Sequence, residues 1–262
     1  MKVIVIASGS KGNCTYVEDN GQAILIDAGI SYKRVREAID GYQLSGIPMG
    51  ILITHEHNDH INSLRIIANK LHIPVYLTEK TYQALPSNQR DIDEMFIEPN
   101  LPLEIGTFKI TPIRIFHDAR DPVGFIINSG NEKLVFITDT GYVHSSVMEK
   151  IKNADAYILE SNHDPDVLMN SDRTFELKRR ILGDRGHLCN EDSAYLLTSV
   201  IGEKTKVIVH AHISMECNYE DIVVNTMKDI FSENGLEYNK YITHCASQTV
   251  PFYFEVNDSN EN

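Results

Sequence analysis

The chain has 262 residues, enough for one large domain or two small ones with a substantial buried core. Its hydrophobic content of 42% and charged content of 23% are ordinary for a globular protein, and no apolar run approaches the length needed to cross a membrane. The net charge of −13 argues against nucleic-acid binding by a basic surface as a whole, although a local basic site stays open.

The start of the chain carries one lysine and an apolar run that is too short for the core of a signal peptide. We interpret this run as a first β-strand and expect a cytoplasmic protein. The cysteines are widely spaced and form no CxxC pair, so we expect free thiols. They are Cys14, Cys189, Cys217 and Cys245.

Hydrophobic periodicity predicts alternating strands and helices. The predicted strands are 3–7, 14–18, 23–27, 51–54, 108–116, 123–128, 134–138, 156–159 and 207–210, with two more near Tyr241 and Phe252. The predicted helices are 31–39, 61–71, 143–151, 175–182, 191–200 and 219–231. An Asn-Gly turn at 19–21 predicts a tight hairpin. Since no linker or repeat interrupts this pattern, we predict one α/β domain over 1–256, with helices outside two sheets, and a disordered tail at 257–262.

A dense histidine cluster follows the strand at 51–54, in the sequence THEHNDH. Because imidazole and carboxylate groups are costly to bury unpaired, such a cluster indicates a metal site. The pair His55 and His57 can reach one ion from the end of the strand. The helix that follows can present Asp59 and His60 to a second ion a few ångströms away, as in two-metal hydrolases.

Three further polar residues come directly after apolar strands, where α/β sheets place functional groups. They are His117, Asp139 and His212. Each one alone is as consistent with a capped strand end as with a metal ligand. Together with the histidine cluster they complete two coordination spheres.

The order H-x-H-x-D-H after an apolar strand, followed by strand-end His, Asp and His, resembles the metallo-β-lactamase superfamily. The resemblance spans nearly the whole chain and includes Asp27 in the sequence LIDAG. It implies an α/β fold, a four-layer αββα sandwich with the metals at one edge. Asp27 would orient the ligand cluster by hydrogen bonds.

The same resemblance implies the division of the ligands between two ions. The ligands of the first ion would be His55, His57 and His117. The ligands of the second would be Asp59, His60 and His212. Asp139 would bridge the two. Histidine and carboxylate ligands without thiolate suit Zn²⁺, Mn²⁺ or Fe²⁺, and the histidine-rich set favours Zn²⁺.

Four stretches outside the metal motifs resemble the YycJ/WalJ-type subfamily, whose members are regarded as DNA exonucleases acting from the 5′ end. They are SGSKGNCTYVE near the start, HDARDPVGF at 117–125, LESNHD at 159–164 and DRGHLCNEDSA at 184–194. Two departures, Cys189 in place of an expected Ser and the sequence HISMECN at 212–218, concern substrate contacts rather than metal ligands.

Several other residues admit both a structural and a functional interpretation. The loop at 8–13 is either an ordinary connection or a phosphate contact through Lys11 and Asn13. His187 is either a packed residue or a group that contacts phosphate or protonates a leaving oxygen. Glu160 and His163 either support the ligands as a pair or stabilise their loop.

The segment 173–187 carries five basic and two acidic side chains in an acidic protein. This pattern is typical of a solvated helix face. The functional interpretation is a track for the phosphate backbone of a nucleic acid, formed by Arg179, Arg180 and Arg185.

We therefore expect a dinuclear metallohydrolase that acts as a phosphodiesterase or nuclease on nucleic acid, by resemblance DNA. A hydroxide bridging the metals would attack phosphorus in line, steered by Asp59 or Asp139, and His187 is the candidate acid. The alternative is hydrolysis of a lactone, thioester or other small ester on the same metals, which would need an apolar acyl pocket. A di-iron oxidoreductase of this fold is expected to carry Glu where His57 stands. A binding module without turnover is the fourth possibility.

Overall fold

The computed structural model describes residues 1–257, and their internal contacts divide them into two units. Unit 1 comprises Met1–Arg114, Ala119–Glu132 and Ala246–Val256. Unit 2 comprises Ile115–Asp118 and Lys133–Cys245, together with residue 257. The predicted disordered tail lies outside the described residues, apart from residue 257. One domain over 1–256 stays a prediction.

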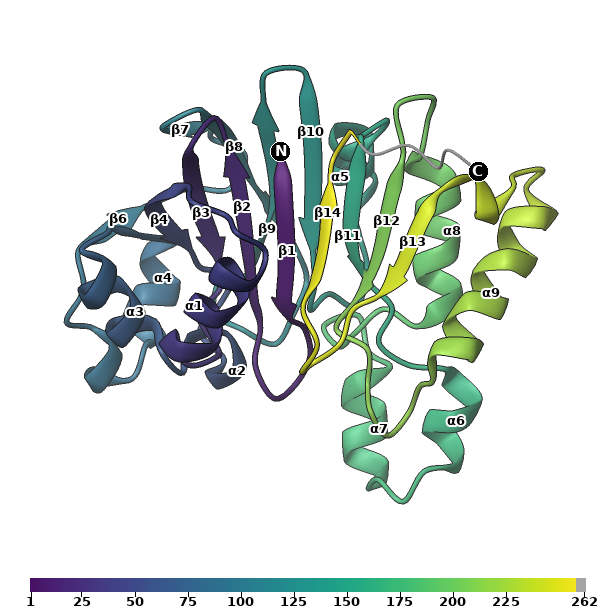
Figure 1. Cartoon of the computed structure of the whole chain (residues 1–262). Helices are drawn as coiled ribbons and strands as arrows, with labels where there is room; N and C mark the ends of the chain where they lie inside the picture. Colours follow the sequence, from purple (N-terminus) through teal and green to yellow (C-terminus); the bar gives the residue numbers. More distant parts are fainter. Residues whose placement is uncertain (258–262) are drawn as a thin grey trace. The chain divides into compact units, whose positions relative to one another are not determined.

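Unit 1 contains a seven-stranded mixed sheet in the order β14-β1-β2-β3-β4-β5-β6 (Figure 1). Strands β1, β2 and β3 are antiparallel neighbours, and β3 to β6 run parallel. The predicted Asn-Gly hairpin joins β2 to β3, with Asn20 and Gly21 both at positive φ. The bounds are β1 Lys2–Ala7, β2 Cys14–Asp19, β3 Gln22–Ile26, β4 Ile47–Leu52, β5 Val75–Leu77, β6 Glu94–Phe96 and β14 Phe252–Glu255.

The last strand of the chain, β14, completes the sheet of unit 1 by pairing antiparallel with the first strand, β1. Three more strands of unit 1, β7 Leu103–Ile105, β8 Phe108–Arg114 and β9 Val123–Ser129, form an antiparallel set. The chain therefore returns to unit 1 after unit 2 has been traversed.

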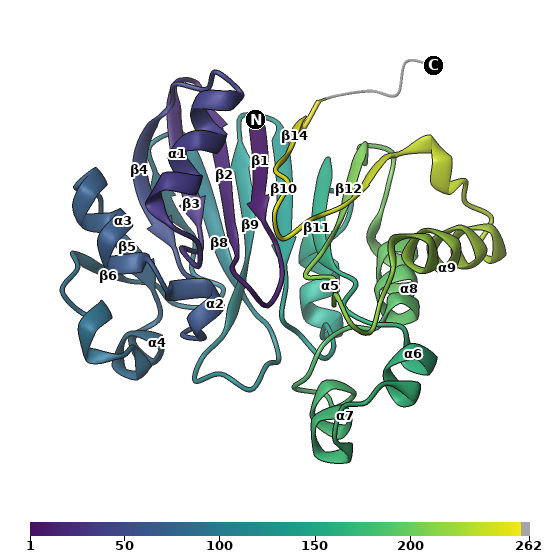
Figure 2. The same cartoon turned by 60° about the horizontal axis from the view of Figure 1, so that its bottom comes forward.

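Helix α1 packs on the sheet of unit 1 (Figure 2) because its apolar residues recur at helical spacing. Val35, Ala38 and Ile39 are buried, and the Ser31 hydroxyl caps the helix by accepting a hydrogen bond from the Arg34 amide. The helices of unit 1 are α1 Tyr32–Gly41, α2 Asn58–Ile61, α3 Leu64–Leu71 and α4 Glu79–Ala84, with a 3₁₀ turn at Ser87–Gln89.

Unit 2 contains four parallel strands in the order β13-β12-β11-β10. Every residue of β11 and β12 is buried, as expected for parallel strands covered on both faces. The bounds are β10 Glu132–Ile137, β11 Ala156–Glu160, β12 Val207–Ala211 and β13 Ile242–Cys245. The helices are α5 Ser145–Ile151, α6 Pro165–Asn170, α7 Phe175–Ile181, α8 Asn190–Val200 and α9 Glu220–Glu233, with a 3₁₀ turn at Tyr238–Lys240.

Two differences from the predicted elements have physical reasons. The helix predicted at 61–71 is divided into α2 and α3, because the Ser63 amide donates instead to the carbonyl of Ala28, at 2.9 Å. Between residues 72 and 107, where no element was predicted, the structure has β5, α4, β6 and β7. These elements have three to six residues, too few for a periodicity to appear.

All four cysteines are free thiols, as predicted. Within the described part of the chain, no helix combines the length and apolar character required to cross a membrane.

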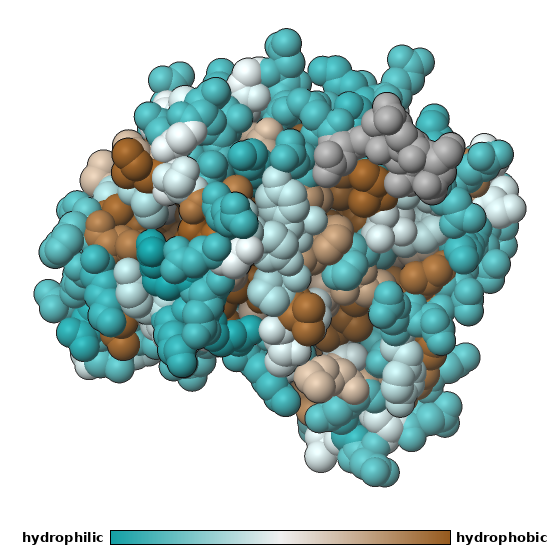
Figure 3. Space-filling view, viewed as in Figure 1, coloured by the Kyte–Doolittle hydropathy of each residue, from teal (hydrophilic) through white to brown (hydrophobic). Residues whose placement is uncertain are grey.

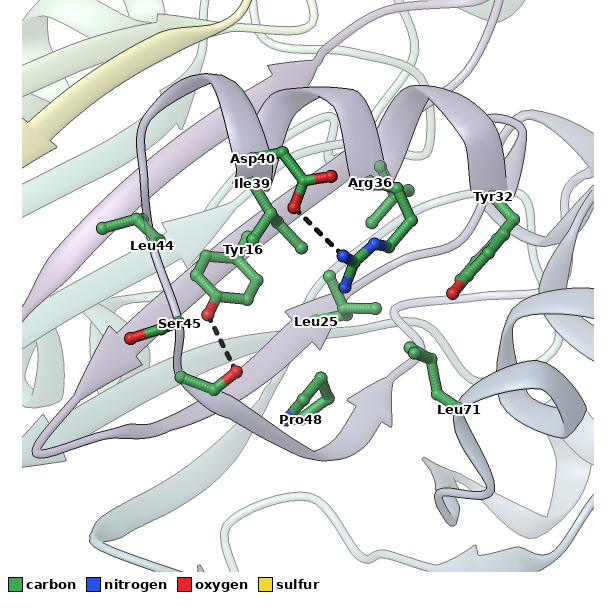
Figure 4. Close-up of a pocket in the computed structure, with 12 residues that line it drawn as sticks. Tyr16, Leu25, Tyr32, Arg36, Ile39, Asp40, Leu44, Ser45, Pro48 and Leu71 are labelled. Atoms are coloured by element: carbon green, nitrogen blue, oxygen red, sulfur yellow. Dashed lines mark hydrogen bonds and ion pairs between the residues drawn. The ribbon is translucent and has the colours of Figure 1, made fainter.

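A pocket of about 280 Å³ lies in unit 1 beneath α1 (Figure 4). Among its lining residues, Tyr16 donates a hydrogen bond from its hydroxyl to Glu18, at 2.8 Å, and the Arg36 guanidinium pairs with Asp40 at 3.0 Å. None of the predicted site residues lines this pocket. This pocket is therefore separate from the predicted site.

Candidate metal and catalytic residues

In unit 1, Asp27 ties the loop after β3 to the histidine cluster after β4. Its carboxylate is fully buried and accepts hydrogen bonds from the Thr54 amide and hydroxyl, each at 2.9 Å. Its second oxygen lies 2.8 Å from Nδ1 of His60. A buried carboxylate held in this way fixes the orientation of the imidazole ring.

The imidazole rings of the unit 1 cluster lie against one another. The ring centroid of His55 lies 4.6 Å from that of His57 and 4.1 Å from that of His60. The Thr54 hydroxyl lies 3.0 Å from Nδ1 of His55 and 3.2 Å from Nδ1 of His60. Because the Nδ1 sides of these two rings face Thr54, Nε2 is the nitrogen that each can offer to an ion.

Asn13 joins this cluster rather than the exposed part of its loop. Its side-chain nitrogen lies 3.0 Å from Nε2 of His60 and 3.2 Å from a carboxylate oxygen of Asp59. Its side-chain oxygen accepts from the Gly9 amide at 2.7 Å. The neighbouring Lys11 is exposed, and so it is the residue of this loop that can reach a substrate.

Gly29 allows the loop after β3 to approach the cluster. A Cβ atom at this position would lie 1.6 Å from the carbonyl oxygen of Asp59. The Asn13 amide donates to the same carbonyl at 2.8 Å. Only a residue without a side chain fits here. The sequence LIDAG therefore contributes two features, the carboxylate of Asp27 and the close packing at Gly29.

In unit 2, the Asp139 carboxylate faces three imidazole nitrogens, of which Nδ1 of His187 lies 3.7 Å away. The same oxygen of Asp139 lies 3.5 Å from Nε2 of His212 and 3.8 Å from Nε2 of His117. The Nδ1 atom of His117 lies 3.0 Å from the Gly186 carbonyl. Burial lowers the pKa of His117, against the opposing effect of the Asp139 charge, and so favours the neutral form that binds metals.

Glu160, the last residue of β11, holds two further rings of unit 2. Its Oε1 lies 2.8 Å from Nδ1 of His187 and 3.0 Å from Nδ1 of His212. The amides of Thr140 and Leu188 donate to its Oε2. Burial alone would raise the pKa of Glu160, but the His187 charge and the hydrogen bonds from both histidines outweigh it and lower that pKa to about 2.

The donor atoms of four unit 2 residues lie within 4.8 Å of one another, as a metal site requires. These residues are Asp139, Glu160, His187 and His212. The set contains only carboxylate oxygens and imidazole nitrogens, the donors that suit Zn²⁺ or Mn²⁺. Among them Asp139 and His212 are the candidate ligands, whereas Glu160 contacts the Nδ1 atoms of His187 and His212 and so orients their rings.

Three of the predicted site residues have a left-handed backbone conformation. Asp27, Asp139 and His212 follow strands β3, β10 and β12, and all have φ between 51° and 60°. Residues other than glycine adopt this left-handed conformation at a cost of about 1–3 kcal/mol, and such residues concentrate at functional sites.

Of the residues Glu160 and His163, for which two roles were left open, it is Glu160 that contacts the rings of His187 and His212. His163 is buried beside Cys189, and no hydrogen bond engages its ring nitrogens within the described residues. Burial lowers the pKa of His163 to about 4. It lies in the packing beneath the site and not among the donor atoms.

The basic residues of segment 173–187 have different roles. Arg180 pairs with Asp118 at 2.5 Å, and Arg185 donates to the His117 carbonyl at 3.2 Å. Both therefore brace the segment that carries His117. Arg179 is exposed and makes no ion pair among the described residues. Of the three predicted phosphate contacts, it is the one whose guanidinium pairs with no other described residue.

A pocket of about 740 Å³ in unit 1 is lined in part by a residue from the histidine cluster. It is lined by Glu56, which lies between two predicted ligands, and by two cations, Lys80 and Arg120. The Arg120 amide donates to Glu56 at 2.8 Å. No sequence pattern singled out either cation: Lys80 lies where no element was predicted, and Arg120 stands only within the motif HDARDPVGF.

Two other contributors to the site left no signal in the sequence. The Thr54 hydroxyl and the Gly186 carbonyl both contact Nδ1 atoms of predicted ligands. A threonine hydroxyl or a backbone carbonyl carries no motif of its own. Only the folded chain reveals such contacts.

Comparison with known proteins identifies the family of the chain. The family model described as "Beta-lactamase superfamily domain" matches residues 22–211. The chain is 38% identical over 235 residues to "Exodeoxyribonuclease YycJ" of Bacillus anthracis, which covers 88% of this chain and 89% of that protein. It is 34% identical over 262 residues to "Exodeoxyribonuclease WalJ" of Streptococcus pneumoniae, with 95% and 96% covered.

Solved structures show the same fold. The metallo-β-lactamase fold protein YhfI from Bacillus subtilis matches with a TM-score of 0.71 and 17% identity, covering 97% of this chain and 99% of that one. The Zn²⁺-bound PqqB of Methylobacterium extorquens matches with a TM-score of 0.68 and 15% identity, covering 96% and 99%. The predicted α/β sandwich is therefore confirmed as the fold class. The chain belongs to the β-lactamase superfamily of metal-dependent enzymes, in the group that contains YycJ and WalJ.

Proposed function

We propose that the protein is a dinuclear metal-dependent phosphodiesterase, a DNA exonuclease that degrades its substrate from the 5′ end. The observation that carries this proposal is the histidine–carboxylate donor set in a chain 38% identical to a named exodeoxyribonuclease over 88% of its length. The donor set supports metal-dependent hydrolysis, and the relatives support the choice of nucleic acid.

The proposed ligands are those of the sequence analysis. The first ion would be held by His55, His57 and His117. The second would be held by Asp59, His60 and His212. Asp139, whose oxygen lies within 4 Å of the proposed ligands His117 and His212 and also of His187, is the proposed shared ligand. When bound, two Zn²⁺ or Mn²⁺ ions supply an activated water and neutralise charge on the phosphate.

The residues around these ligands would orient them and move a proton. Asp27 and Thr54 fix rings in unit 1, and Glu160 fixes rings in unit 2. His187 is the proposed acid, because Glu160 engages its Nδ1 and its side chain is 16% exposed. The ionised Glu160 would stabilise the imidazolium, so His187 can give a proton to the leaving oxygen.

The proposed substrate contacts are the basic residues that face solvent. In unit 1 they are Lys11, Lys80 and Arg120. In unit 2 Arg179 is the exposed cation, while Arg180 and Arg185 also support the protein. Because the chain carries −13 overall, these local groups must supply the attraction for a polyanion. We expect this reaction to take place in the cytoplasm.

The deciding experiment incubates the purified protein with single- and double-stranded DNA and RNA, labelled at either end. Each reaction contains Zn²⁺, Mn²⁺ or a chelator. We expect mononucleotide release from 5′-labelled DNA at early times, dependent on metal. A parallel panel of a lactone and a thioester tests the acyl alternative. Hydrolysis of acyl substrates alone, insensitive to salt, would refute the proposal.

A further inference from the structure

The inner face of α7 fixes the helix within unit 2. Leu177 and Ile181 pack with Leu168 of α6 and with Cys217. The Lys178 ammonium donates to the carbonyls of residues 169 and 171, each at 2.7 Å, and so closes the connection between the two helices. Figure 1 shows α6 and α7 side by side as a helical hairpin.

The outer face of α7 carries side chains that the packing does not explain. Phe175 is 70% exposed, and Leu182, the capping residue directly after the helix, is 47% exposed. Arg179 lies between them at spacings of four and three residues, so the three side chains share one face. Figure 3 shows apolar side chains mixed with hydrophilic ones on the surface over this hairpin. We call these three residues the outer stripe.

The charge around the outer stripe identifies the kind of ligand. Segment 173–187 has five basic and two acidic side chains in a chain of net charge −13. Arg173 and Arg180 are paired with Glu216 and Asp118. Arg179 makes no such pair among the described residues, so its charge is available to an anion. An exposed aromatic ring beside an unneutralised arginine is the combination that binds bases and phosphates of single strands.

The outer stripe leads directly to the catalytic residues of unit 2. The His187 amide donates to the carbonyl of Ile181, at 3.0 Å, and the carbonyl of Gly186 faces His117. From Phe175 to Leu182 the stripe extends for about 10 Å, at about 1.5 Å per residue. That length accommodates about three stacked bases at about 3.4 Å each.

We propose that the outer stripe binds the single-stranded part of a nucleic-acid substrate, with Phe175 stacked on a base and Arg179 on a phosphate. The inference rests on the proposed nuclease function and adds the form of the substrate. Bases inside a duplex are paired and stacked on both faces and so are not open to Phe175, and the enzyme should favour single strands and frayed or overhanging ends.

The chain contains no tryptophan, so Phe175→Trp introduces a single fluorescent reporter. The probe is a single-stranded phosphorothioate oligodeoxynucleotide, titrated with metal present. We expect its bases to quench the tryptophan emission, and an abasic strand of the same length to leave the emission unchanged. Unchanged emission with a strand whose anisotropy shows that it is bound would overturn the proposal.

Kinetics test the stripe without a reporter. Phe175→Ala and Phe175→Leu should both raise KM for single-stranded DNA by about fivefold to a hundredfold, since leucine cannot stack. Their kcat on a small phosphodiester should equal that of the wild type. Tyr195→Ala, which removes an aromatic side chain of 49% exposure from α8, should leave both values unchanged.

Other outcomes separate the stripe from the function on which it depends. A wild type that hydrolyses no nucleic acid contradicts the proposed function. A wild type that degrades DNA while Phe175→Ala leaves KM unchanged contradicts only the stacking. If Phe175→Leu retains full affinity, the stripe is a surface for apolar contact rather than for bases.

Discussion

At the scale of single residues, the sequence indicates candidate ligands more readily than the groups that support them. Histidines and carboxylates at strand ends are recognisable because few structural roles require them there. The sequence also placed Asp27 correctly beside the cluster, where it contacts His60. Thr54 and the Gly186 carbonyl were missed, and the contact of Glu160 with His187 was not foreseen. Which ring a buried carboxylate meets depends on packing across the fold, and sequence spacing does not encode it.

Asp139→Asn should lower kcat on DNA by more than about a hundredfold, because it removes the charge that three histidines face. Metal content per chain, measured by atomic emission, should fall in parallel. Asp155→Asn is the matched control, since Asp155 is buried in the same unit and accepts a hydrogen bond from the Lys133 amide. Full activity and full metal content in Asp139→Asn would remove this residue from the ligand set.

His210 should make the fold sensitive to acid. Burial lowers the pKa of its ring to about 3, and the ring lies 2.6 Å from the Tyr238 hydroxyl and 3.3 Å from the Ser161 hydroxyl. The unfolded chain binds a proton near pH 6.5 and the folded chain does not, so this contribution to stability is complete above about 6.5 and declines as pH falls toward 3. Urea midpoints measured between pH 7 and 4 should fall more steeply for the wild type than for His210→Gln. Parallel curves would exclude His210 as a source of the acid sensitivity.

At the scale of elements, length decided what could be predicted. Helices α1, α8 and α9 have ten to fourteen residues and show a clear apolar period. The elements between residues 72 and 107 are too short for such a pattern. The division between α2 and α3 was also missed, because its cause is a tertiary hydrogen bond from Ser63 to Ala28. At this position a hydrogen bond between residues far apart in the sequence, and not the local hydrophobic periodicity, determines where the helix begins.

Two glycines of unit 1 should respond to alanine in opposite ways. At Gly29 the new Cβ would collide with the Asp59 carbonyl, so Gly29→Ala should destabilise the fold and displace a predicted ligand. At Gly41, in the last turn of α1, nothing lies within 4 Å of the new atom, and Gly41→Ala should raise the free energy of unfolding by about 0.5–1 kcal/mol. Thermal unfolding of both variants tests the pair. A stable Gly29→Ala with normal metal content would mean that the loop can move aside.

At the scale of the whole molecule, charge sets the conditions for binding. A chain of −13 repels a polyanion at a distance, and the Debye length of about 8 Å at physiological salt limits attraction to local cations. Many basic side chains are already engaged, as Arg114 is with Asp121 at 2.6 Å and Arg180 with Asp118. Affinity for DNA should therefore be modest and strongly dependent on salt.

The arginines of segment 173–187 should differ in their contribution to salt dependence. Each phosphate contact on a single strand adds about 0.7 to the slope of log affinity against log salt. Arg179→Ala should remove about one such contact. Arg180→Ala should change the slope less, because the Arg180 guanidinium already pairs with Asp118. Binding isotherms by fluorescence anisotropy at four salt concentrations give the slopes. Identical slopes for the wild type and Arg179→Ala would assign this residue to an ordinary helix surface.

The pairing of β14 with β1 has a consequence for synthesis on the ribosome. Strand β1 is made well before β14, so the edge of β1 that β14 covers stays open while almost 250 residues are added. At about 5–20 residues per second, that interval lasts for at least about ten seconds. An open strand edge recruits other chains during such an interval, so the nascent protein should depend on chaperones. A chain terminated after residue 245 should bind trigger factor or enter inclusion bodies, and its solubility should return when residues 246–257 are supplied as a separate peptide.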